Sequence, residues 1–366
     1  MSLDAYRGAI MLLMASGGLE LSRLAKNSNS SAMQFLGHQC AHAEWAGCTV
    51  WDLIQPSFMF MVGVALPWSV ANRRAQGQPF GSLFAHALWR SLLLVLLAVF
   101  LTSAWSKQTD WVFTNVLAQI GLGYPFLFLL AFARPRTQWV AAFTILIGYW
   151  TAFVWHAHAH DQTLAAAWDK NANFASSFDL WFLNLFPRAT PYTLNDGGYQ
   201  TLNFVPSLAT MIFGLLAGQW LRSAGDIAAK LPRLVAFGAA GVALGWMIDG
   251  AGLCPLVKRI WTPSWAIFST GWAALLLAGF VAVIDLRGWR RWAFPLVVAG
   301  MNPIALYVMW QLSSGFIRGS LKIHLGQDIF ASFGPTLTPT LERAGVLITL
   351  WLVLLWMHRR KIFIRL

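Results

Sequence analysis

Long apolar stretches recur along the chain and alternate with short polar segments. About 20 apolar residues are the length that a helix needs to cross a bilayer. Nine stretches are clear candidates, and a tenth, Ala5–Leu21, is marginal because Arg7 and Glu20 bracket a short apolar run. The pattern predicts an all-α integral membrane protein, a bundle of about ten transmembrane helices. The nine clear stretches are Val50–Ala71, His86–Trp105, Trp111–Phe132, Trp139–Trp155, Leu202–Leu221, Leu234–Ile248, Pro263–Ile284, Trp292–Ile317 and Ala344–Met357.

The composition agrees with this pattern. Hydrophobic residues make up 57% of the chain and charged residues 11%, whereas an ordinary globular chain has about 25% charged residues. With 21 Trp and 26 Phe among 366 residues, a water-soluble protein could not bury its apolar surface. Disordered, collagen-like and disulfide-stapled classes are excluded as well. The three cysteines form no disulfide framework, and Cys40 and Cys48 would pair only if their shared loop meets an oxidising compartment.

In a membrane protein, a net charge of +12 reflects how the chain is oriented in the membrane. We do not expect a nucleic-acid partner. With the N-terminus in the cytoplasm, sixteen basic residues fall inside and ten outside, while three acidic residues fall inside and eleven outside. Basic residues concentrate in cytoplasmic loops, so we predict that both termini are cytoplasmic. Residues 1–366 then form one polytopic domain with extracytoplasmic loops at 22–49 and 156–201. No cleavable signal is expected at the start of the chain.

The first outer loop holds the richest set of reactive side chains. His38, His42 and Glu44 precede a span that opens with Asp52, a residue that is costly at membrane depth. A histidine can accept the proton of an amine or hydroxyl that attacks an ester. Either Glu44 or Asp52 would orient it. The competing interpretation is a hydrated loop with an interfacial histidine.

His156, His158 and His160 have the spacing of metal ligands. On a strand all three would share one face, but on a helix only His156 and His160 would. They lie where a span leaves the membrane, and no nearby cysteine or histidine completes a shell, so we expect no metal. GxGxxG, P-loop, HExxH and GxSxG patterns are absent from the sequence, which argues against nucleotide hydrolysis, a zincin or a serine hydrolase.

Several polar residues interrupt the spans or their ends. Such groups normally face a bundle interior or a cavity, and together they indicate a polar path through the protein. They are Asn115, Gln119, Asn203, Asp249, Lys258, Ser264, Asn302 and Gln311.

Six segments, in order, follow known sequence motifs. Ser2–Gly8 is similar to S-x-D-x-F-R-G. His42–Gly47 with Asp52–Phe58 is similar to H-A-x-W-N-G … D-L-[IV]-F-P-x-F. The others are Val116–Tyr124 (V-L-Q-R-I-x-x-x-Y), Asn203–Ser207 with Gly214 and Gly218 (S-T-I-P-A … G … G), Pro255–Ser264 (P-x-x-K-x-L-W-T-x-S) and Gly300–Tyr307 (G-x-N-x-[IL]-x-x-Y). Through these six motifs the chain resembles the transmembrane heparan-α-glucosaminide N-acetyltransferase family and its short bacterial relatives.

The resemblance implies an integral acetyltransferase that takes acetyl-CoA from the cytoplasm and acts on an amino sugar or glycan outside. The family's catalytic histidine opens H-A-x-W and falls on His42, with Asp52 beside it. Basic inner residues such as Arg7, Arg73 and Arg74 suit the phosphates of CoA. The expected setting is the bacterial cytoplasmic membrane, with membrane lipid as a partner and a homodimer as one open assembly. Further candidates for the pocket are Trp45, Glu44, Asn203, Lys258, Trp261, Ser264, Asn302 and Arg7.

Three positions depart from the family pattern. Ala15 replaces the asparagine of V-N-Y-G-G, Ala46 replaces that of W-N-G, and Asn195–Gly198 is a reduced form of D-P-E-G. Because the asparagine that Ala15 replaces would serve as an oxyanion or amine partner, two alternatives stay open. One is an amino-sugar permease or exporter on the same fold, and the other is an O-acyltransferase of a cell-envelope glycan. Direct transfer and an acetyl-histidine intermediate are both open too.

Overall fold

The structure, a computed structural model, describes residues 1–26 and 28–364 and is built of helices. Arg365, one of the sixteen inner basic residues, lies outside the described residues. No strand occurs in the described part, where the one isolated β-bridge joins Ala46 to Val257. The α-helices are α1 Ser2–Ala15, α2 Leu21–Lys26, α3 Ser31–Gln39, α4 Ile54–Ala75, α5 Phe80–Ser103, α6 Val116–Leu130, α7 Pro135–Ala159, α8 Phe174–Phe182, α9 Phe204–Arg222, α10 Ile227–Gly250, α11 Pro263–Phe280, α12 Phe294–Met301, α13 Pro303–Leu325 and α14 Thr338–Arg359.

The all-helical, membrane-type architecture is confirmed, but the count of ten spans is not reproduced. In the described residues seven helices are long and apolar enough to cross a membrane, or nine if two bent pairs each count as one span. The stretch predicted at Trp111–Phe132 is the 15-residue helix α6, about 22 Å long and short of the about 30 Å apolar thickness. The first stretch bends by 43° after α1.

The predicted span Trp292–Ile317 is two helices that meet at 72°. Asn302 leaves the helical region between them, with φ −131° and ψ 53°. Pro303 then starts α13 at a position where its missing N–H costs nothing. The Asn302 side chain donates from Nδ2 to the Ile362 carbonyl (3.0 Å) and accepts from the Ile364 amide (2.9 Å). Asn302 therefore fastens the C-terminal segment to the break.

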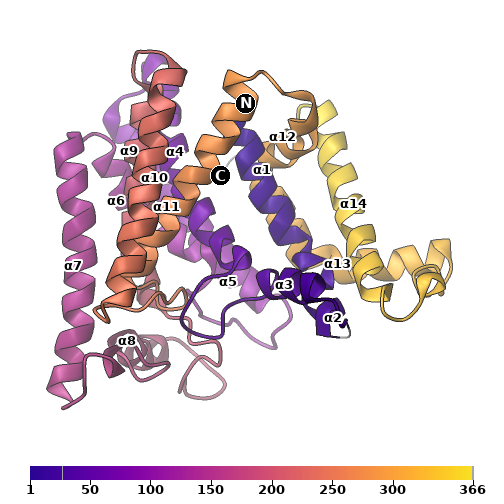
Figure 1. Ribbon diagram of the computed structural model, residues 1–366, viewed down its shortest axis with the longest axis horizontal. Coiled ribbons are helices and arrows are strands. Elements are labelled where there is room, and N and C mark those ends of the chain that lie inside the picture. The colour runs from indigo at the N-terminus through magenta and orange to yellow at the C-terminus, as the bar shows by residue number, and fades with distance from the viewer. Residues whose placement is uncertain (27, 365–366) are drawn as a thin grey trace. The chain divides into compact units, whose positions relative to one another are not determined.

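The described chain divides into two compact units. The first comprises Met1–Glu44, Cys48–Ile54 and the chain from Gly279 onward, and the second comprises Trp45–Gly47 and Gln55–Ala278. In Figure 1 the first unit is drawn in indigo (α1 to α3) and in orange to yellow (α12 to α14), so it joins the two ends of the sequence.

Glycines set the helix packing of the first unit. A Cβ on Gly8 of α1 would lie 1.7 Å from the Leu296 carbonyl oxygen of α12, and one on Gly300 would lie 1.8 Å from the Asp4 carbonyl oxygen. Close approach of helix backbones at small residues is typical of membrane proteins. The two glycines belong to the first and last of the motif segments above, which are distant in sequence and packed together here.

In the second unit, α9 is the central helix, with 78% of its apolar window buried. It packs on α4 through Gly63, Gly214 and Gly218, where an added Cβ would lie 1.9 to 2.3 Å from a backbone oxygen. By contrast, α7 and α10 expose large apolar side chains such as Ile147 and Trp246, as lipid-facing helices do.

Candidate active site

His42 and Asp52 form a hydrogen-bonded pair in the first unit. The His42 Nδ1 lies 2.7 Å from the Asp52 Oδ1. Asp52 is almost fully buried, whereas 40% of the His42 side chain is exposed. An imidazole that is accessible on one side and anchored to a buried carboxylate on the other is the arrangement that general bases use.

The local sequence explains how Asp52 is held. Residues Val50–Leu53 form a short 3₁₀ helix that leads into α4, and Thr49 precedes it with the Thr-x-x-Asp spacing of a capping box. The second carboxylate oxygen, Oδ2, accepts from the backbone amides of Ala43 (3.0 Å) and Thr49 (3.2 Å). The Thr49 hydroxyl lies 2.7 Å from the Ala41 carbonyl oxygen. These contacts close the loop between His42 and Asp52.

This geometry determines the chemistry of His42. Oδ2 of Asp52 accepts the two backbone N–H bonds, and Oδ1 faces the His42 ring. Because Oδ1 is an acceptor, this arrangement favours the His42 tautomer with hydrogen on Nδ1. The basic nitrogen is then Nε2. A base of this kind removes a proton from an amine or hydroxyl as that group attacks a carbonyl.

Trp45, Ala46 and Gly47 belong to the second unit, although their neighbours on both sides belong to the first. The Trp45 indole Nε1 donates to the Trp168 carbonyl (3.0 Å). Ala46 forms the bridge with Val257, and the Gly47 amide donates to the Leu256 carbonyl (2.8 Å). This three-residue segment is therefore fixed by backbone pairing within the second unit.

The reduced motif at Asn195–Gly198 lies against the same part of the second unit. Gly198 has φ +76°, and a Cβ there would lie 2.6 Å from the Trp45 ring. Arg259 donates from Nη1 to the Gly197 carbonyl (2.7 Å) and lies over the Tyr199 ring. Motif segments that are far apart in sequence thus meet around the turn at 255–264.

Asn203 joins this group from the start of α9. Its Nδ2 donates to the Arg259 carbonyl (2.7 Å), and its buried Oδ1 has no hydrogen-bond partner in the part of the chain that the structure describes. A buried acceptor of this kind normally has a partner. It is a position at which a bound hydroxyl or amide would complete the hydrogen bonding.

Three more predicted residues lie in this turn or, for Ser264, at the start of α11. Lys258 is buried. Trp261 is fully buried with φ +47°, in a conformation unusual for a tryptophan, and its Nε1 lies 3.3 Å from the Thr210 hydroxyl. Ser264 is buried and donates to the Pro255 carbonyl (2.7 Å). Burial raises the pKa of the neighbouring Cys254 thiol to about 11, so this thiol is protonated and is no nucleophile.

The remaining predicted residues lie elsewhere in the first unit. Glu44 is exposed, and Arg7 donates to Asp4 (3.0 Å). Asn302 binds the C-terminal segment, as described above. Ala15, where the family has asparagine, ends α1 in a buried position.

The histidines at 156–160 continue α7, with His160 as its C-cap. The His156 and His160 rings lie 4.3 Å apart, and His160 Nδ1 contacts the His156 carbonyl. Among residues 1–26 and 28–364, no group of three His, Cys, Asp or Glu side chains is arranged to hold a metal ion. The three cysteines all lie in this described part, and no disulfide joins any two of them.

Two contributors to these sites were not predicted. Thr49 supports Asp52, and its Thr-x-x-Asp spacing was readable in the sequence. Arg259 connects the 255–264 turn to Gly197, a contact between residues 62 positions apart that no local pattern signals.

Comparison with known proteins agrees with the motif evidence. No family model matches the chain. The human heparan-alpha-glucosaminide N-acetyltransferase is 21% identical over 99% of this chain and 59% of its own length. The mouse heparan-alpha-glucosaminide N-acetyltransferase is 23% identical over 80% of this chain and 53% of its own length. The chain thus spans between half and three fifths of these relatives. It is a distant relative of the heparan-alpha-glucosaminide N-acetyltransferases.

Proposed function

We propose that the protein is a transmembrane acetyltransferase that moves an acetyl group from cytoplasmic acetyl-CoA to an amino sugar or glycan on the extracytoplasmic side. The observation that carries the proposal is the 2.7 Å pair of His42 and buried Asp52. It occurs in a chain related along nearly its whole length to membrane N-acetyltransferases.

In this proposal His42 Nε2 takes a proton from the acceptor amine as the amine nitrogen attacks the thioester carbonyl. The C–N bond forms, the C–S bond breaks, and His42 returns the proton to the departing thiolate. The carboxylate of Asp52 keeps hydrogen on Nδ1 and stabilises the imidazolium that forms. Alternatively, Nε2 attacks the thioester itself and passes the acetyl group to the acceptor in a second step.

Arginines suited to the phosphates of CoA end the helices on the predicted cytoplasmic side. Arg73 and Arg74 end α4. Arg73 lies 2.8 Å from His86, and Arg74 lies over the Phe132 ring. Neither partner is a carboxylate, so neither contact offsets the positive charge of these arginines.

The proposal is tested by acceptor-dependent release of CoA from acetyl-CoA by the purified protein. We expect His42→Ala to lower the rate at least about a hundredfold, while a thermal shift on added CoA persists. The matched control is His38→Ala, an exposed histidine on α3, which should cost only a few-fold. Rapid-quench mass spectrometry of the wild type then separates the two routes, because only the second labels His42 with acetyl.

Near-normal turnover of His42→Ala would refute the assignment of the base. Sugar flux in proteoliposomes without acetyl-CoA would favour the permease instead. Transfer to a hydroxyl but not to an amine would favour the O-acyltransferase.

A further inference from the structure

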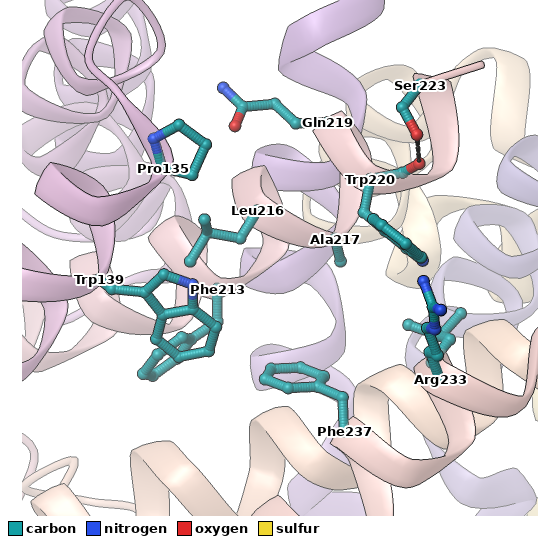
Figure 2. Close-up of a pocket in the computed structure, with 11 residues that line it drawn as sticks. Pro135, Trp139, Phe213, Leu216, Ala217, Gln219, Trp220, Ser223, Arg233 and Phe237 are labelled. Carbon is teal, nitrogen blue, oxygen red and sulfur yellow. Dashed lines mark hydrogen bonds between the residues drawn. The ribbon is translucent and has the colours of Figure 1, made fainter. Parts of the chain in front are cut away.

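A groove in the second unit runs between α7 and α10 and has α9 and α11 as its floor. Its wider part has a volume of about 610 Å³ and is drawn in Figure 2, where Trp139 and Phe213 lie on the left, Trp220 and Arg233 on the right, and Phe237 at the bottom between them. A narrower part of about 200 Å³ shares Trp139, Phe213 and Phe237 and continues to Leu244. We call the two parts together the α7–α10 groove.

One end of the α7–α10 groove is basic. The Arg233 guanidinium lies 5.3 Å from the centre of the Trp220 ring, and Gln219 and Ser223 line the same end. Arg134 and Arg136 flank the lining residue Pro135, and Arg222 ends α9; all three are exposed and have no ion-pair partner within the described residues.

Two other charged groups at this end hydrogen-bond to the backbone at the ends of α9 and α10. Lys230 donates to the carbonyls of Leu221 and Ser223, where α9 ends. Asp226 caps α10 by accepting from the Ala228 amide (3.1 Å). Asp226 is outnumbered by the basic residues at this end, so the net charge at the mouth of the groove is positive.

Beyond Arg233 the lining is aromatic and aliphatic, except for the Thr270 hydroxyl. Leu244 follows Arg233 by eleven positions along α10, which is about 16 Å of helix. That length is about half of the apolar thickness of a bilayer, about 30 Å. The groove also adjoins surfaces of α7 and α10 that expose Val140, Phe143 and Leu244, so it opens toward lipid rather than water.

We propose that the α7–α10 groove binds an anionic glycerophospholipid from the cytoplasmic leaflet. The phosphate lies among Arg233, Arg222 and the arginines beside Pro135, and one acyl chain lies along Trp139, Phe213 and Phe237. A basic mouth of this kind favours anionic over zwitterionic lipid by about 1 kcal/mol per arginine, or about fivefold. A nucleotide would leave its polar groups unpaired along the apolar part of the groove. This inference is independent of the proposed acetyl transfer.

Native mass spectrometry of the detergent-purified protein tests the proposal, with phosphatidylglycerol and phosphatidylcholine as probes. The wild type should retain phosphatidylglycerol at least about fivefold more tightly than phosphatidylcholine. Arg233→Gln should lower this preference about fivefold, whereas Arg290→Gln, an exposed arginine outside the groove, should keep it. Ala240→Phe, which fills the narrow part without changing charge, should weaken binding of both lipids.

Equal retention of the two lipids by the wild type would overturn the proposal. So would an Arg233→Gln variant that keeps the wild-type preference. If CoA displaces the lipid and Arg233→Gln abolishes the thermal shift on added CoA, the groove is a nucleotide site and the lipid assignment is wrong. None of these outcomes depends on acceptor-dependent turnover, so failure here is distinguishable from failure of the acetyltransferase proposal.

Discussion

At the scale of single residues, Asp52→Asn tests how His42 is oriented. The Ala43 and Thr49 amides both donate to Oδ2, so the asparagine must place its oxygen there and turn its NH₂ toward His42. That NH₂ donates to Nδ1, and the ring then carries its hydrogen on Nε2 and loses the base. We expect acetyl transfer to fall at least about a hundredfold with CoA binding retained.

The control for this variant is Asp161→Asn, an exposed carboxylate at φ +55°, a conformation that asparagine tolerates. Its rate should stay within a few-fold of wild type. Asp52→Asn protein that is folded and fully active would show that the tautomer of His42 does not matter.

A second buried carboxylate predicts a pH dependence of stability. Asp179 in α8 is fully buried, and its Oδ2 accepts from the Thr201 amide (2.8 Å). Burial raises the pKa of this carboxyl from 3.8 to about 6, although the bonds to Thr201 and the charge of Arg188 oppose the rise. The unfolded chain therefore releases this proton at lower pH than the folded chain does, and stability falls as pH rises from about 4 to about 6.

Asp179→Asn removes that cost and keeps an oxygen for Thr201. We expect the variant to have a higher Tm than wild type at pH 7, and the difference to vanish near about pH 4. Unfolding curves of both proteins across this range provide the measurement. A difference in Tm that is constant with pH would show that burial does not raise the pKa of this carboxyl.

At the scale of elements, the contact between α1 and α12 gives a sharp test. Gly300→Ala would place a Cβ 1.8 Å from the Asp4 carbonyl oxygen, and the two helices must separate to admit it. Overpacking of this kind typically costs about 1–3 kcal/mol, so we expect a clear fall in Tm.

Gly315→Ala in α13 is the matched control, because nothing lies within 4 Å of its added Cβ and alanine is the better helix former. Its Tm should equal or exceed that of wild type. If Gly300→Ala behaves in the same way, α1 and α12 do not pack as described.

The helices themselves were largely readable from hydropathy, and their exceptions have physical reasons. Apolar runs located α7 and α10, but the helices extend beyond the predicted ends, into polar residues such as Arg136 and Lys230, because a helix continues into the headgroup region. The helix break at Asn302 could not be predicted from the sequence, because proline also occurs within continuous membrane helices.

The candidate site was readable only in part. The sequence predicted His42 as the base, with Glu44 or Asp52 as the residue that orients it. It could not predict the backbone amides that hold Asp52, because their positions depend on how the loop folds. The bridge between Ala46 and Val257 joins residues more than two hundred positions apart, so no local pattern announces it.

At the scale of the whole molecule, the orientation that we predict from the charge distribution is open to direct labelling. Positive charge gathers at helix ends such as Arg73 and Arg74 of α4, which the orientation places in the cytoplasm. In a chain without its three native cysteines, we expect a membrane-impermeant thiol reagent to label Ser30→Cys in intact cells.

Gln76→Cys should react only after the cells are permeabilised, which also serves as the control for its reactivity. Both positions are exposed. Labelling of Gln76→Cys but not of Ser30→Cys in intact cells would invert the topology and place His42 on the cytoplasmic side.

The first unit contains both the first and the last helices of the chain, and this has a consequence for translation. Gly8 leaves the ribosome 292 residues before its packing partner Gly300. At about 5–20 residues per second, translation takes about 15–60 s to cover that distance. Throughout this interval α1, which carries Arg7, has been made without the helix on which it packs. The nascent protein must retain this first helix, by an insertion factor or by the lipid interface, until the last helices emerge.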